Sequence, residues 1–182
     1  MSVLAIDPAV HGTVRIALTL LFLWAAGHKL RDVPAFCSAV ANYELVPSGW
    51  IGPFATGVIA MELGVAAGLW LPRLAAIAAL AAAGVLAAYA GAMAINLVRG
   101  RRDIDCGCIG AAGRRPLSGA LEVRNGVLAL AALTIAPPAA ARPLAWFDAI
   151  TIGAGAAALA CLYAASEAVL ANAPKIAALQ HE

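Results

Sequence analysis

The sequence predicts an all-α fold, a helical bundle that crosses a membrane several times. Of its 182 residues, 63% are hydrophobic and only 12% are charged, whereas a soluble domain usually carries about a quarter charged residues. The apolar residues form long blocks separated by short polar joints, and a chain of this length is expected to be a single transmembrane domain, residues 1–182. The composition excludes an ordinary cytosolic enzyme. The net charge of +2 is too small to indicate binding to nucleic acid.

Five segments are expected to form the membrane spans, since a bilayer core about 30 Å thick requires roughly 20 apolar residues in a helix. Four of them are apolar throughout: Val14 to Leu30, Ile51 to Leu71, Leu74 to Val98 and Leu144 to Leu170. A fifth candidate, Leu117 to Ala136, has a polar first half that would lie at the interface. With five spans, the chain is a multi-pass protein with the lipid bilayer as its solvent.

The segment from Asp32 to Trp50 is too polar to cross a bilayer, yet its apolar residues recur at helical spacing. These residues are Val33, Phe36, Val40 and Tyr43. Such spacing predicts a short amphipathic helix in the membrane interface. We expect it to cover the bundle on the side that carries the loop between Val98 and Leu117.

The basic residues indicate an orientation. Nine of the twelve fall on the side of that loop if the chain has five spans: Lys29, Arg31, Arg99, Arg101, Arg102, Arg114, Arg115, Arg124 and Lys175. Because cytoplasmic loops carry an excess of lysine and arginine, the loop is predicted to face the cytoplasm and the N-terminus to lie outside.

The same loop contains the main candidates for chemistry, Cys106 and Cys108, which flank a glycine. A disulfide between residues two apart closes a small strained ring, and strained disulfides exchange readily. The pair is therefore a candidate redox site. Thiolates also select soft metals such as copper(I), and two unrelated thiols in a glycine-rich loop are the third reading.

Two other cysteines are expected to differ in role. Cys37 follows the first span and lies on the same side as the Cys106–Cys108 loop, because two spans separate them. It is a candidate shuttle that could form a mixed disulfide with the pair, or else a small buried side chain. Cys161 falls inside the last span, where we expect it to serve packing.

Glu62 falls at the centre of the second span, where a lone carboxylate costs at least about 2.5 kcal/mol. It should be protonated, paired or facing a polar cavity, and we expect an intramembrane acid or proton site or a bond that locks two helices. Its candidate partners are Asn96, His28, Lys29 and Arg15. Lys29 is nevertheless expected to extend to the lipid headgroups, as is its neighbour Arg31.

Several motifs together resemble the MauE methylamine-utilisation family, which is related to DoxX-like membrane proteins. The motifs are Gly27-His28-Lys29-Leu30-Arg31-Asp32, Tyr43-Glu44-Leu45-Val46-Pro47, Glu62, and the run from Asn96 to Arg102 that leads into Asp105-Cys106-Gly107-Cys108-Ile109-Gly110. The likeness covers Val14 to about Val127, and the run into Asp-Cys-Gly-Cys is its specific part. Ile109 stands where the family has phenylalanine.

This resemblance implies a role in making methylamine dehydrogenase, a periplasmic quinoprotein whose small subunit is rich in disulfides. It implies a protein of the inner membrane that acts with a thioredoxin-like partner, periplasmic or membrane-anchored, in processing, export or disulfide formation of that subunit. A periplasmic client requires the Cys106–Cys108 loop outside, whereas the arginines place it inside, where thiols are kept reduced.

Three functions follow from the residues and the resemblance. The first is a membrane thiol:disulfide oxidoreductase or maturation factor, the second a non-catalytic scaffold for a thioredoxin-like partner, and the third a soft-metal carrier that uses Cys37, Cys106 and Cys108. No sequence pattern identifies a cofactor site or a resident metal. A quinone as electron acceptor near Glu62 is compatible with the first function.

Overall fold

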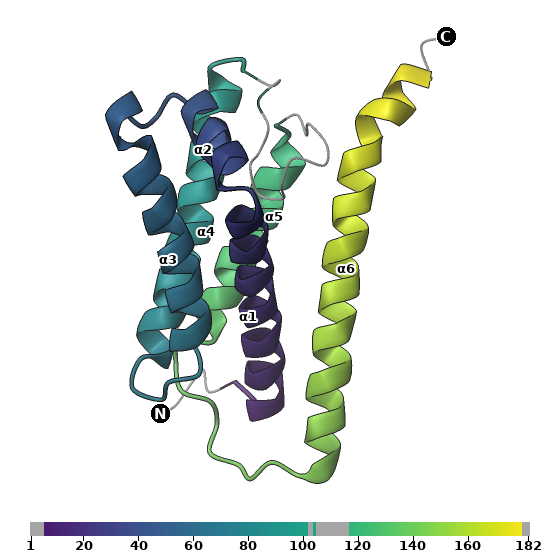
Figure 1. The fold of residues 1–182 in the computed structure, drawn as a ribbon. Coiled ribbons are helices and arrows are strands. Elements are labelled where there is room, and N and C mark those ends of the chain that lie inside the picture. The colour runs from purple at the N-terminus through teal and green to yellow at the C-terminus, as the bar shows by residue number, and fades with distance from the viewer. Residues whose placement is uncertain (1–5, 102–103, 105–116, 180–182) are drawn as a thin grey trace.

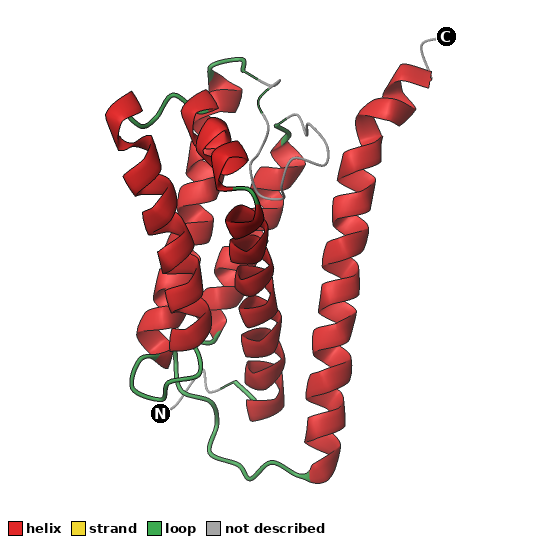
Figure 2. Cartoon of the chain, in the orientation of Figure 1, coloured by secondary structure: helices red, strands yellow, loops and turns green. Residues whose placement is uncertain are grey.

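The computed structural model describes residues 6–101, 104 and 117–179, and in these ranges it is helical without strands. Figure 1 shows a bundle of upright helices with one long helix standing at its side, and Figure 2 shows the long loop that leads to that helix. The elements are α1 (Pro8–Arg31), α2 (Val33–Asn42), a 3-10 turn (Ser48–Trp50), α3 (Ile51–Gly68), α4 (Ala75–Val98), α5 (Gly119–Thr134) and α6 (Trp146–Leu179).

Two aspartates begin the first two helices. Asp7 accepts a hydrogen bond from the backbone N–H of Ala9, and Asp32 accepts one from that of Ala35. Each carboxylate satisfies a backbone donor that has no partner within the helix. Asp32 also ends α1, so the chain turns at this residue into α2, the interfacial helix that the spacing of Phe36 and Val40 predicts.

Four of the helices are long and apolar enough to cross a membrane: α1, α3 with its preceding turn, α4 and α6. Their outward faces expose large apolar side chains, among them Leu20, Leu23, Ile77, Leu80, Ile150 and Leu162. A soluble protein rarely exposes so many on all sides. The prediction of a helical membrane bundle is confirmed.

The predicted fifth span is a shorter helix. α5 has 16 residues, which at 1.5 Å per residue gives about 24 Å, less than the hydrocarbon core. It packs along α4 and returns the chain between α4 and α6, which both run upward in Figure 1. Within the described ranges the chain therefore keeps the predicted order of five segments, and four of its helices have the full length.

Small side chains bring α3, α4 and α5 together. Alanines 78, 79, 82 and 83 of α4 are all buried, and a Cβ on Gly68 of α3 would lie 3.0 Å from that of Ala78. Close approach through small residues is typical of membrane helices. α1 adds the large side chains of Leu18 and Phe22 to this core.

α4 ends in a left-handed glycine. Gly100 has a φ of 76°, and the N–H groups of Gly100 and Arg101 donate to the carbonyls of Leu97 and Asn96. This is the Schellman arrangement that satisfies the last carbonyls of a helix. It directs the chain back over the end of α2.

α6 packs mainly against α1 and otherwise lies apart from the bundle (Figure 1). Its closest approach places Gly155 against Thr13, where an added Cβ would come within 2.9 Å of the threonine methyl. Towards its other end, Glu167 accepts a hydrogen bond from Arg124 of α5, and that guanidinium lies 4.9 Å from the ring of Tyr163. Cys161 is exposed on this helix, so the expectation that it serves packing is wrong.

Candidate functional site

The centre of the bundle contains a buried ion pair. Lys29 Nζ, near the end of α1, lies 2.5 Å from Glu62 Oε1 in α3. The lysine side chain is 4% exposed and the glutamate 0%. Lys29 is thus the partner of Glu62 among those the sequence offered, and the expectation that it extends to the headgroups is wrong. Arg31, two residues later, is exposed as expected.

A third side chain completes the pair. The hydroxyl of Tyr89 in α4 donates to the same Glu62 Oε1 at 2.7 Å, so one carboxylate oxygen joins three helices. The rings of Tyr89 and Phe36 also lie 5.4 and 5.2 Å from Lys29 Nζ, within the range of a cation–π contact. Tyr89 was missed in the sequence. The signal was present, because Tyr89 and Asn96 are the only residues of α4 with hydrogen-bonding side chains, and a buried hydroxyl needs a partner.

The pair is incompletely satisfied. Glu62 Oε2 is buried and has no hydrogen-bond partner within the described residues, while a carboxylate can accept about four bonds. The lysine ammonium can donate three and gives one to Glu62. Because the two charges cancel, the site is neutral overall. It can still donate and accept further hydrogen bonds inside the membrane.

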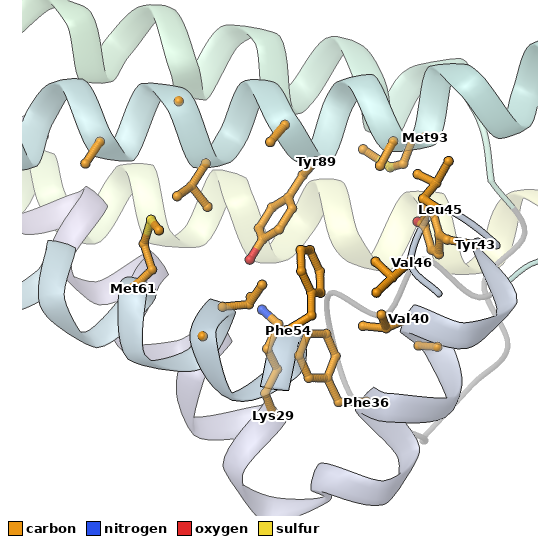
Figure 3. A pocket seen from close by; sticks show the side chains of 18 residues that line it. Lys29, Phe36, Val40, Tyr43, Leu45, Val46, Phe54, Met61, Tyr89 and Met93 are labelled. Atoms are coloured by element: carbon orange, nitrogen blue, oxygen red, sulfur yellow. The ribbon is translucent and has the colours of Figure 1, made fainter. Parts of the chain in front are cut away.

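A cavity of about 640 Å³ lies directly beside this trio, between α2, α3 and α4 (Figure 3). Among its lining residues, polar side-chain atoms come only from Lys29, Tyr43 and Tyr89. Phe36 and Phe54 form its aromatic wall near Lys29. Pockets of 300 to 1,000 Å³ that are mostly apolar with a few polar groups are typical of small-molecule sites.

α2 forms the end of the cavity and is held by α4. Asn96 Nδ2 donates to the carbonyl oxygen of Tyr43 at 3.3 Å and to that of Ala92 at 3.1 Å. Beyond it, Arg101 and Glu44 form an ion pair at 2.8 Å. The interfacial helix is therefore fixed above the buried pair, and its apolar face becomes a wall of the pocket.

Of the predicted cysteine site, the structure describes Cys37. It is half-buried in α2, and α2 lies at the end of the bundle where α4 ends and α5 begins (Figure 1). That Cys37 shares a side with Cys106 and Cys108 stays a prediction. Cys106 and Cys108 lie outside the described residues. Within the residues described, no three histidine, cysteine or acidic side chains converge on a metal-sized site.

The helices and the site define a class: a multi-pass membrane protein with a buried charge pair beside a lipophilic pocket. A family model described as "Methylamine utilisation protein MauE" matches residues 7–138, which include α1 to α5 and end before α6. The chain belongs to the MauE family.

Curated relatives agree over most of the chain. It is 44% identical over 131 residues to "Methylamine utilization protein MauE" of Paracoccus denitrificans, covering 72% of this chain and 70% of that protein. It is 42% identical over 162 residues to the protein of the same name from Methylorubrum extorquens, covering 89% and 87%. The protein of that name from Methylophilus methylotrophus is 36% identical over 168 residues, covering 88% and 86%. No solved structure is similar to the chain.

Proposed function

We propose that this chain is a membrane factor for methylamine utilisation that helps to mature the small subunit of methylamine dehydrogenase, by thiol–disulfide exchange at Cys106 and Cys108. The pathway follows from the family, whose curated members carry methylamine utilisation in their names. The client is the one that the sequence resemblance implies.

The observation that carries the chemistry is the Cys106-Gly107-Cys108 sequence. An exchange breaks one S–S bond and forms another, so two electrons and two protons pass between the dithiols and no other reagent is needed. Cys37 supports the proposal from the structure: it is half-buried in α2, at the end of the bundle where the loop begins and ends. A third thiol at that end could accept a mixed disulfide.

The test compares cysteine variants in cells that grow on methylamine. The double variant Cys106→Ser/Cys108→Ser should leave the cysteines of the dehydrogenase small subunit open to maleimide, measured as a mass increase, and growth on methylamine should cease. Cys161→Ser is the matched control, because Cys161 is exposed on α6, and it should behave as wild type.

The competing functions appear as other outcomes. Full disulfide formation in the double variant would overturn thiol exchange and favour the scaffold. Stoichiometric copper(I) or zinc in the purified wild-type protein, lost in the double variant, would indicate the metal carrier instead. Cys37→Ser should slow maturation if Cys37 is the shuttle, and should leave the rate unchanged if it serves only packing.

A further inference from the structure

The cavity beside Lys29 is built for a neutral lipophilic molecule. Its walls are mostly apolar side chains, and polar side-chain atoms lie at Lys29 and Tyr89 on one part of the wall and at Tyr43 on another (Figure 3). Two glycines line it, Gly57 of α3 and Gly84 of α4, and a Cβ built on either meets nothing within 4 Å. Both glycines therefore face open space, and the volume is available to a ligand.

The cavity is reached from the bilayer. Phe54 and Met61 line it and are 47% and 52% exposed, and both lie on α3, which is long and apolar enough to cross the membrane. A ligand dissolved in the lipid could therefore enter between α3 and α4 without passing through water.

The depth of the polar end argues against a phospholipid headgroup. Glu62 follows Trp50 by twelve residues of helix, about 18 Å at 1.5 Å per residue, while half of the hydrocarbon core is about 15 Å. A phosphate would have to leave the headgroup level and be buried near the midplane, which is costly for a charged group. The Lys29 charge is already balanced by Glu62, so no second anion is required.

The ammonium group of Lys29 and the aromatic rings of the cavity wall favour a ligand that has a carbonyl group on a flat ring. Lys29 has ammonium hydrogens beyond the one given to Glu62, and a carbonyl oxygen would accept one of them. The rings of Phe36, Phe54 and Tyr89 surround the lysine (Figure 3), and aromatic rings stack favourably on a second flat ring. Val58, Met61 and Val85 continue the wall as an apolar surface for a hydrocarbon tail.

We propose that this cavity binds a membrane quinone, with a ring carbonyl on Lys29 and the tail along α3 and α4. Binding itself does not depend on the proposed function. Its redox consequence does: a dithiol oxidised to a disulfide releases two electrons and two protons, and a quinone takes up both pairs to become a quinol. Glu62, with one buried oxygen without a hydrogen-bond partner in the described part of the chain, is placed to hold a proton beside the ring.

The test is equilibrium binding of decylubiquinone to the purified full chain in quinone-free nanodiscs. Gly84→Phe should fill the cavity and weaken binding at least tenfold. Gly91→Phe is the control in the same helix, because Gly91 is exposed, does not line the cavity and also has open space around it; it should bind as wild type. Equal affinity in both variants would overturn the proposal, as would a wild-type protein that retains only phospholipid and binds no decylubiquinone.

A second measurement separates this proposal from the proposed function. Cys106→Ser/Cys108→Ser should bind decylubiquinone as tightly as wild type, since neither cysteine is part of the cavity. If that variant binds quinone and still matures the small subunit, thiol exchange fails and the quinone site stands. If wild type matures the subunit and Gly84→Phe does so at the same rate without binding quinone, the quinone site has no part in the function.

Discussion

Lys29 and Glu62 form an ion pair between α1 and α3 that is shielded from solvent on both sides, with Nζ and Oε1 2.5 Å apart. Each residue compensates the buried charge of the other. A carboxylate alone at this depth would be protonated or would face a polar cavity, and a lysine alone would extend to the surface. The ion pair therefore fixes the axial position of α1 relative to α3.

Removing one member of the pair should be far more harmful than removing both. Lys29→Met is expected to lower the free energy of unfolding by about 3–5 kcal/mol, because it leaves an uncompensated buried carboxylate. Lys29→Met/Glu62→Met should recover most of the loss, since apolar replacement of a buried pair is often neutral. Unfolding in mixed micelles, followed by circular dichroism, measures both values.

Arg31→Met is the control for this pair, because Arg31 is exposed on the same turn of α1. It should change the stability by no more than about 0.5 kcal/mol. Equal losses in the single and double Lys29 variants would mean that the uncompensated carboxylate is not the cause of the loss.

The Tyr89 hydroxyl should contribute through Glu62. Tyr89→Phe removes a 2.7 Å hydrogen bond to a carboxylate oxygen, and bonds to charged groups are worth about 1.5–3 kcal/mol. The same substitution in a Glu62→Gln background should cost clearly less, which a double-mutant cycle measures. If the cost is the same in both backgrounds, the hydroxyl acts through another neighbour.

These three residues show what the sequence could predict. Glu62 is visible because a carboxylate inside a 20-residue apolar segment has few alternatives to a partner, and α2 is visible from the spacing of Phe36 and Val40. The choice of Lys29 over His28 or Arg15 required the rotation and slide of α1 against α3. That offset depends on how the side chains of the two helices pack together, which no residue pattern encodes.

The errors have the same origin. Cys161 was expected to serve packing, but α6 contacts the other helices mainly through α1 and leaves Cys161 exposed. A helix that is apolar all round does not indicate which side faces lipid. The cavity could not be predicted at all, since it is a space left between α2, α3 and α4 and is recognisable only once these helices are placed.

At the opposite end of the bundle, Arg142 joins the start of α1 to the start of α6 and makes that junction sensitive to acid. Its guanidinium donates to both carboxylate oxygens of Asp7, at 2.7 and 2.9 Å, and to both of Asp148, at 2.8 Å. The hydrogen bonds from Arg142 hold the pKa of Asp7 below its ordinary value of 3.8, helped by the N–H of Ala9. The two aspartates raise the pKa of Arg142 in turn.

The stabilisation by Asp7 should therefore be fully present above pH 3.8 and be lost as the pH falls through the lower pKa of the folded state. Asp7→Asn should be less stable than wild type at pH 6, and the difference should shrink as the pH approaches 2. Thermal unfolding of both proteins across that range checks this. A difference that stays constant would show that the negative charge of Asp7 is not what stabilises the junction.

The orientation of the bundle can be tested with two exposed positions at its opposite ends. Ser48 lies in the turn that follows α2, at the end of the bundle where α4 ends, and Ala141 lies beside the start of α1, where the N–H of Ala140 donates to the carbonyl of Ile6. Single cysteines at these positions, in a chain without its native cysteines, should react differently with a membrane-impermeant maleimide in intact cells. The excess of arginine and lysine predicts labelling of Ala141→Cys and protection of Ser48→Cys until lysis.

Labelling of Ser48→Cys alone would place Cys37 and the ends of the loop outside. The excess of basic residues would then have predicted the wrong orientation. The reason would be that Lys29 and Arg124 form ion pairs within the bundle, so their positions are determined by helix packing as well as by membrane orientation.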